Sequence, residues 1–189
     1  GQDSTLATEG NLNNEIGVPL TLLRLGPEHR YAVVEMGAGK PGDIQYLCEF
    51  ARPDVSVLLN AMPAHLERMG SLENIATTKG AILAGVADGG WAIYPADSEF
   101  TPLWREMAGS ARRLEFGFDS SAAVHASDLQ LDTGSSTFTL HIDGHSAEIY
   151  LPLPGRHNVA NAMAAAAAAV AAGLELSKVP AGLAAVPPQ

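Results

Sequence analysis

The stretch that decides the fold spans residues 31–59, "YAVVEMGAGKPGDIQYLCEFARPDVSVLL". It begins with the apolar run 31–34 and ends with the apolar run 55–59. Both runs are short and rich in β-branched residues, as in strands that are buried on both faces. Helix-forming residues fill positions 43–51 between them and stop before an Arg-Pro pair. This order predicts a strand, a helix and a second strand, which is the βαβ unit of a parallel sheet.

The same alternation continues along the chain. Residues 72–86 have the apolar spacing of a helix, and residues 91–94 form another short apolar run. Repetition of the strand-helix pattern is typical of a parallel sheet whose faces are covered by helices. We therefore expect an α/β fold with a mostly parallel sheet.

The pattern changes after Leu114. Residues 123–131, 136–142 and 147–151 alternate apolar with polar side chains, and the turn sequences "DTGS" and "DGHS" between them favour antiparallel hairpins. An alanine-rich helix is expected to follow over residues 158–172, ending at a C-terminal glycine cap. The fold class is thus an α/β sheet with an added antiparallel β section.

Composition limits what the protein can do. With 189 residues, 47% of them hydrophobic and 17% charged, the chain is expected to form one compact domain. Its net charge of -10 opposes sequence-independent binding to nucleic acid. The single Cys48 excludes an internal disulfide and fits a reducing compartment. No signal peptide or run long enough to span a membrane is present, so we expect a soluble cytoplasmic protein. A start at Gly1 and a proline-rich end suggest an excised domain.

Polar residues follow two of the predicted strands, at the edge of a parallel sheet where ligands gather. Glu35 comes directly after the first strand and precedes a glycine-rich turn that lacks the ending of a Walker A motif. Either a cation binds its carboxylate, or backbone N–H groups of that turn do. Asn60 and His65 follow the second strand. His65 is either a structural histidine or a metal ligand shared with a nearby acid.

Lys79 lies on the apolar stripe of the helix predicted for residues 72–86. A lysine in that position either extends its amine to solvent or meets an anion. In the second case, desolvation would lower its pKa and leave the amine partly neutral and nucleophilic.

Asparagines cluster in two places. "GNLNNEIGVPLTLL", residues 10–23, places three of them before a helix predicted for residues 19–25, where they either cap the helix or face a ligand. In "PGRHNVANAMAAAAAA", Asn158 and Asn161 are three residues apart and share one helix face. Either could be the N-cap, but a second amide on an alanine-filled helix suggests recognition of a ligand such as adenine.

Five motifs together resemble one known set. In chain order, "GNLNNEIGVPLTLL", "VVEMGAGKPGDI", "NAMPAHLERMGS", "TKGAI" and "LPLPGRHNVANAMAAAAA" are similar to the central domain of the Mur ligase family. The resemblance covers nearly the whole chain and is weakest over residues 100–146. It implies a P-loop-NTPase-like domain of a monomeric, ATP-dependent amide ligase of bacterial cell-wall synthesis. Within the family, the motifs are most similar to those of members that join D-alanyl-D-alanine to UDP-N-acetylmuramoyl-tripeptide through an acyl phosphate.

The resemblance also implies roles for particular residues. Glu35 would hold a Mg²⁺ ion that bridges the β- and γ-phosphates of ATP. His65 would hold a second Mg²⁺ shared with the acyl phosphate, and Lys79 would be carbamylated to become a ligand of that ion. The physics agrees, because a reaction between two anions needs metal charge that a chain of net charge -10 cannot itself supply.

Further roles follow from the same resemblance. Asn158 and Asn161, with His157, would face the nucleotide near its adenine. Asn13 and Asn14 would lie near the sugar-nucleotide substrate.

The sequence departs from the family in what it lacks. The P-loop, the amino-terminal domain that binds the uridine nucleotide and the carboxy-terminal domain are all absent. We therefore expect the chain alone to be inactive and to expose a sheet edge or face that favours self-association. Two other interpretations stay open, namely a related ligase with another amino-acid substrate and a non-catalytic nucleotide-binding or interaction module.

Overall fold

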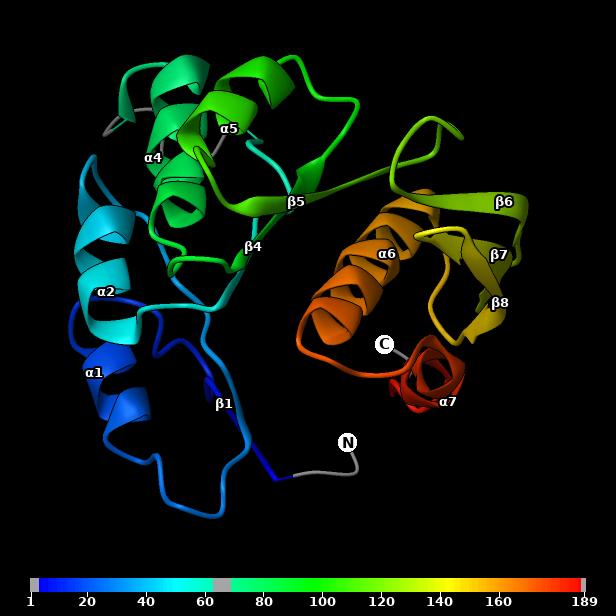
Figure 1. Ribbon diagram of the computed structural model, residues 1–189, viewed down its shortest axis with the longest axis horizontal. Helices are drawn as coiled ribbons and strands as arrows, with labels where there is room; N and C mark the ends of the chain where they lie inside the picture. The colour runs from blue at the N-terminus through cyan, green and yellow to red at the C-terminus, as the bar shows by residue number, and fades with distance from the viewer. Residues whose placement is uncertain (1–3, 63–68, 188–189) are drawn as a thin grey trace.

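Figure 1 shows the computed structural model, which describes residues 4–62 and 69–187. The helices and strands of these residues, in chain order, are β1 (Thr5–Ala7), α1 (Gly17–Leu22), β2 (Tyr31–Val33), α2 (Asp43–Ala51), β3 (Val55–Val57), α4 (Leu72–Ala84), β4 (Trp91–Pro95), α5 (Thr101–Met107), β5 (Arg112–Gly117), β6 (Val124–Leu131), β7 (Ser136–Ile142), β8 (His145–Leu151), α6 (Arg156–Ala171), the 3-10 helix η1 (Leu176–Lys178) and α7 (Val179–Ala184).

The described strands form two hydrogen-bonded groups. β1 and β2 pair in parallel, with Thr5 opposite Tyr31. The other six strands lie in the order β3-β4-β5-β6-β7-β8, parallel from β3 to β6 and antiparallel from β6 to β8. This arrangement confirms the predicted α/β fold with an added antiparallel section.

The prediction for the first strand was wrong in one respect. Residues 31–34 were expected to be buried on both faces and to share a sheet with residues 55–59. Instead, β2 pairs only with β1 among the described residues, and Val33 is 63% exposed. A strand buries both faces only when neighbouring strands and helices cover it, and the described residues supply one neighbour.

Helices cover both faces of the larger sheet. Figure 1 shows α6 on one side of β4 and β5, with α4 and α5 on the other. Alternate residues of β4 follow this division: Ile93 packs in the cluster that contains residues of α6, whereas Tyr94 packs with Trp104 of α5. The Trp104 Nε1–H donates to the carbonyl of Ala76 in α4 at 3.1 Å, which ties the two covering helices together.

Most predicted elements lie where the sequence placed them. α2 and β7 match their predicted bounds, and Gly173 has the positive φ of +92° expected after a helix. The helix expected over residues 19–25 is α1, which begins earlier because Pro19 fits in a first turn, where its missing N–H costs nothing. β1, α5, β5 and α7 were not predicted.

Candidate active site

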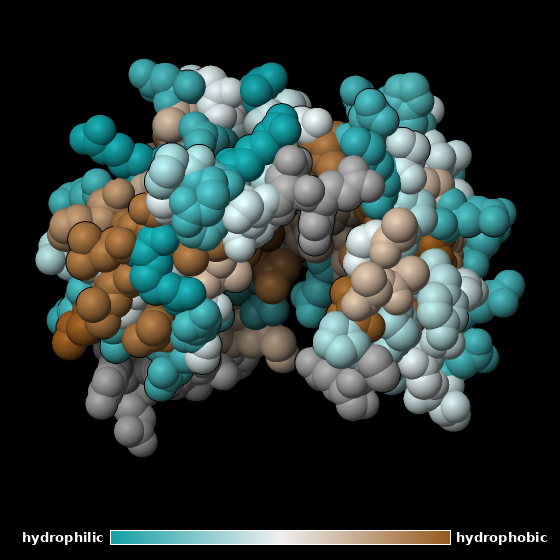
Figure 2. Space-filling view, turned by 90° about the horizontal axis from the view of Figure 1, so that it is seen from below, coloured by the Kyte–Doolittle hydropathy of each residue, from teal (hydrophilic) through white to brown (hydrophobic). Residues whose placement is uncertain are grey.

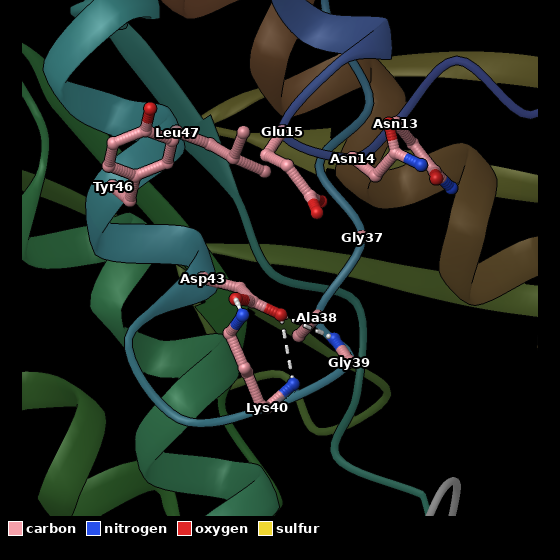
Figure 3. Close-up of a pocket in the computed structure, with 10 residues that line it drawn as sticks. All are labelled: Asn13, Asn14, Glu15, Gly37, Ala38, Gly39, Lys40, Asp43, Tyr46 and Leu47. Carbon is pink, nitrogen blue, oxygen red and sulfur yellow. Dashed lines mark hydrogen bonds and ion pairs between the residues drawn. The ribbon is translucent and has the colours of Figure 1, made fainter.

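A cavity of about 540 Å³ lies between the loop before α1 and the loop that joins β2 to α2 (Figure 3). Both loops follow the carboxyl ends of parallel strands, the edge at which ligands bind in α/β proteins. Ten residues line it: Asn13, Asn14, Glu15, Gly37, Ala38, Gly39, Lys40, Asp43, Tyr46 and Leu47. Asn13 and Asn14, for which the resemblance implies a place near the sugar-nucleotide substrate, both line this cavity.

Asn13 links this cavity to Glu35. Its side-chain Nδ2 donates to Glu35 Oε1 at 2.8 Å, and its backbone carbonyl accepts a hydrogen bond from the Gly37 N–H at 2.6 Å. A Cβ at Gly37 would lie 2.9 Å from Asn13 Oδ1, so a glycine is needed for the two loops to approach this closely. The structure thus joins two motifs that are 22 residues apart in the sequence.

Glu35 is exposed, and its backbone N–H donates to Thr8 Oγ1 at 2.9 Å. The interpretation that the glycine-rich turn satisfies its carboxylate was wrong, because Asn13 provides the hydrogen bond. The N–H groups of Gly39 and Lys40 in that turn instead donate to Asp43 Oδ2, each at 2.9 Å. The carboxylate of Glu35 therefore stays open to solvent on the side away from Asn13.

Asn14 has a different role from Asn13. Its Oδ1 accepts the N–H groups of Ile16 at 3.1 Å and Gly17 at 2.9 Å, at the beginning of α1. These bonds satisfy donors that a helix start leaves without intrahelical partners. The capping interpretation is confirmed for Asn14. The Asn13 side chain does not cap α1 and instead donates its hydrogen bond to Glu35.

Lys79 points toward the carboxyl end of β3. Its Nζ donates to the carbonyl of Asn60 at 3.4 Å, and partial burial lowers the pKa of the amine below its usual value. Lys79 is half-buried, and the contact that its amine makes is with a neutral carbonyl rather than an anion. His65, the third residue of the predicted metal site, lies outside the described residues.

The described residues 4–62 and 69–187 contain no group of three or more His, Cys, Asp or Glu side chains that could hold a metal ion. This does not conflict with a magnesium site, because Mg²⁺ is commonly held by one or two carboxylates together with phosphates and water. The open carboxylate of Glu35, oriented by Asn13, fits that pattern.

The amino terminus of α6 presents the second cluster of predicted residues. Asn158 Nδ2 donates to the carbonyl of Pro154 at 2.8 Å, which stabilises the turn before the helix. His157 and Asn161 are exposed. Of the two amides, Asn158 therefore has a local structural partner, and Asn161 is available to a ligand.

Sequence reasoning missed several residues around these sites. The Arg156 guanidinium carbon lies 3.6 Å from the centre of the Phe118 ring, beside the α6 terminus. In the cavity, Glu15, Lys40 and Tyr46 were not predicted to line a site. Lys40 was noticeable only as a cation within the turn after Glu35, and nothing in the local pattern of the other residues indicated their convergence.

Comparison with known proteins decides the family. The sequence profile of the Mur ligase middle domain matches residues 2–169. The chain belongs to the Mur ligase family. This membership confirms the resemblance seen in the five motifs.

Relatives within the Mur ligase family are similar across nearly the whole chain. A UDP-N-acetylmuramoyl-tripeptide–D-alanyl-D-alanine ligase of Escherichia coli K12 is 43% identical over 182 residues, covering 96% of this chain and 40% of that protein. The structure of a UDP-N-acetylmuramoylalanyl-D-glutamyl-2,6-diaminopimelate–D-alanyl-D-alanyl ligase from Acinetobacter baumannii aligns with a TM-score of 0.92 at 38% identity, covering 99% of this chain and 41% of that chain.

A MurF ligase from Thermotoga maritima, solved in complex with ADP, aligns with a TM-score of 0.83 at 29% identity, covering 98% of this chain and 42% of that chain. This Mur ligase chain thus spans about 40% of the length of the relatives that it matches. In the part of the chain that the structure describes, no helix has the length and apolar character needed to cross a membrane.

Proposed function

We propose that the chain is the central ATP-binding domain of a ligase that joins D-alanyl-D-alanine to UDP-N-acetylmuramoyl-tripeptide in peptidoglycan precursor synthesis. The hydrogen bond from Asn13 to Glu35 supports this proposal most directly, because it joins the loop proposed to face the substrate to the acid proposed to bind the metal, at one edge of β1 and β2. The similarity to ligases named for this reaction supports the substrate assignment. The lone thiol, Cys48, fits action in the reducing cytoplasm.

Glu35 is the proposed ligand of a Mg²⁺ ion that would be shared with the phosphates of ATP. Such an ion would neutralise negative charge during phosphoryl transfer to the substrate carboxylate. Asn13 donates one hydrogen bond to Glu35 Oε1 and so fixes the orientation of the carboxylate, leaving its other oxygen for the cation. Asn13 and Asn14 together form the proposed wall against the sugar-nucleotide substrate.

Lys79 and His65 are the proposed ligands of a second Mg²⁺ ion. The lowered pKa of Lys79 favours the neutral amine, which can attack carbon dioxide. That step forms one N–C bond, releases one proton and gives a carbamate, an oxygen ligand of the kind that Mg²⁺ prefers. Activity that is the same in carbon-dioxide-depleted buffer and with added bicarbonate would contradict the carbamate.

Asn161 and His157 at the beginning of α6 are proposed to face the nucleotide near its adenine, with Asn158 beside them. An amide can pair with the exocyclic amine and ring nitrogen of adenine. The ADP complex of the Thermotoga maritima neighbour supports nucleotide binding by this fold.

The P-loop, the uridine-nucleotide domain and the carboxy-terminal domain are proposed to belong to the longer enzyme. A further parallel strand between β2 and β3 would give both strands a second neighbour, which each lacks among the described residues. Ser56 in β3 supports this arrangement: its Oγ is buried without a hydrogen-bond partner in the described structure.

The decisive experiment measures phosphate release by the full-length enzyme, meaning the longer protein of which this chain is proposed to be the central domain. With ATP, Mg²⁺ and UDP-N-acetylmuramoyl-tripeptide, release is expected to depend on added D-alanyl-D-alanine and to match the amount of amide product. Release that is indifferent to D-alanyl-D-alanine but depends on another amino acid would indicate a related ligase. No nucleotide-dependent release at all would indicate a non-catalytic module.

A further inference from the structure

The outer face of the antiparallel section carries a pair of histidines. β6 and β7 lie at the end of the molecule away from α1 and α2, and α6 packs against one of their faces (Figure 1). Val124 and Ala126 of β6 are buried in the cluster that contains residues of α6, so the side chain between them, His125, points to the other face. His141 of β7 lies between two buried residues in the same way.

The two imidazole rings contact each other directly. His125 and His141 are cross-strand partners in the antiparallel ladder. Their ring centres lie 4.4 Å apart, with an angle of 11° between the ring planes, and both residues are half-buried. Because the ladder holds the Cβ atoms of such partners about 4.5–5.5 Å apart, the backbone brings the two rings together without a ligand.

Hydrogen bonds fix which nitrogen of each neutral ring carries the hydrogen. His125 Nδ1 lies 3.0 Å from the carbonyl oxygen of Ala122, which only accepts, so this nitrogen bears the hydrogen. Ser127 Oγ donates its single hydrogen to Asp128 Oδ2 at 2.8 Å. In its 2.9 Å contact with His141 Nε2, Ser127 Oγ must therefore accept, and the imidazole donates. The second nitrogen of each ring keeps its lone pair, and within the described ranges 4–62 and 69–187 it has no protein partner.

A bulge in β6 places a carboxylate behind His141. The register of the β6–β7 ladder shifts after Ser127, and Asp128 adopts a positive φ of +52°. The Asp128 carboxylate accepts hydrogen bonds from Ser127 and, at 3.1 Å, from Thr139 Oγ1 of β7. These two bonds lower the pKa of the Asp128 carboxyl, so it is ionised at neutral pH. One hydroxyl group thus connects His141 to a negative charge.

These surroundings are typical of histidines that bind metal ions. Such a histidine uses one nitrogen as the ligand and donates the hydrogen of the other to a backbone carbonyl or a carboxylate, which orients the ring. His125 has the carbonyl, and His141 has the carboxylate by way of Ser127. Neutral imidazole suits Zn²⁺, Cu²⁺ and Ni²⁺, whereas Mg²⁺ prefers oxygen ligands.

We propose that His125 and His141 together bind one divalent transition-metal ion, with Zn²⁺ as the expected occupant. The ligand atoms are His125 Nε2 and His141 Nδ1. Water fills the remaining positions, because no third His, Cys, Asp or Glu ligand joins the pair among the described residues. A nitrogen lone pair lies in the plane of its ring, so the two stacked rings must tilt from parallel to reach one ion. The site is separate from the proposed active site and does not rest on the proposed function.

The first test titrates the untagged chain with ZnCl2 at neutral pH and follows the nitrogen NMR resonances of the histidine rings. Before metal is added, they are expected to show hydrogen on His125 Nδ1 and on His141 Nε2. Zn²⁺ is expected to shift the resonances of His125 Nε2 and His141 Nδ1 in step, as one shared ion requires. MgCl2 at the same concentration should shift neither.

The second test measures the affinity for Zn²⁺ by calorimetry in three variants. His125→Gln and His141→Gln are each expected to weaken binding at this site by at least about tenfold, since the loss of an outer partner alone costs about 10- to 100-fold. Ser127→Ala keeps both rings but removes the connection to Asp128, so a loss of about tenfold is expected. Zn²⁺ bound elsewhere in the chain is unaffected by these substitutions and is subtracted.

His145→Gln is the matched control. His145 is exposed and pairs with Ile142, a buried residue, so it shares the opposite face of the sheet and should not contribute to the site. Thermal unfolding verifies that each variant folds.

The possible results decide between a shared site and independent histidines. Zn²⁺ that shifts only one ring, or an affinity that neither glutamine variant lowers, would overturn the proposal. An unchanged affinity in Ser127→Ala would overturn the role given to Ser127 and Asp128. None of these results changes the phosphate-release experiment, so the proposed function stands or fails separately.

Discussion

The two ends of the chain differ in how completely they cover their apolar side chains. Between β7 and α6, Leu140 and Met163 have no exposed surface, and Phe138 is 3% exposed. Around α1 and β2, Leu23 is 82% exposed and Val33 is 63% exposed. Figure 2 shows apolar atoms gathered on the surface at the end of the molecule that holds α1 and α2. The end that contains the proposed active site is thus the one whose apolar side chains are left uncovered.

Strand connectivity explains the difference. The antiparallel strands β6, β7 and β8 follow one another by short turns, so each finds its neighbour locally and α6 completes the core. Parallel strands need neighbours from distant parts of a chain, and β1 with β2 has only the other as partner among the described residues. The remainder of the proposed longer enzyme is expected to pack against this unfinished sheet.

The largest expected effect is on the free energy of unfolding, in a comparison of a buried leucine with an exposed one. Leu140→Ala is expected to lower the free energy of unfolding of the chain by about 2–5 kcal/mol, because it creates a cavity in a closed core. Leu23→Ala, the matched substitution, should change it by less than about 0.5 kcal/mol. Urea unfolding followed by circular dichroism measures both. A large loss for Leu23→Ala would contradict the comparison, since it would mean that self-association buries this surface.

Substitutions at the end that holds α1 and β2 should affect activity more than stability. Glu35→Gln in the full-length enzyme is expected to lower kcat by at least about 10- to 100-fold, the loss typical when even an outer partner of a metal ligand is removed. Because Glu35 is exposed, the unfolding midpoint should not change. Glu148→Gln, at an exposed position of β8, is the control and should leave kcat unchanged. Wild-type turnover in Glu35→Gln would remove the metal assignment.

The smallest predicted effect distinguishes two neighbouring amides. Asn14→Ala should cost about 1 kcal/mol of unfolding free energy, because the beginning of α1 loses its cap. Asn11→Ala, in the same loop, removes no side-chain hydrogen bond seen in the described residues and should be neutral. Equal unfolding curves for Asn14→Ala and wild type would show that α1 is held by packing alone.

Local patterns predicted much of the fold. Helix-forming residues ahead of an Arg-Pro pair gave the bounds of α2, and alternation between turn signals gave the antiparallel section. β1 was missed because three residues are too few for periodicity, and β5 because its sequence "RRLEFG" begins with two charged residues. The apolar run that contains β2 correctly predicted a strand but not its burial, which depends on neighbours.

By itself, the sequence determined the α/β class, the family motifs and the residue types at the ends of the strands, because these follow from side-chain order along one segment. Only the tertiary structure decided which amide serves which purpose: Asn14 caps α1, and Asn13 reaches Glu35 across 22 residues of sequence. It also decided that Glu15 and Lys40 line one cavity. Such pairings depend on how closely two loops approach each other in space, and the local periodicity of the sequence carries no information on the distance between loops.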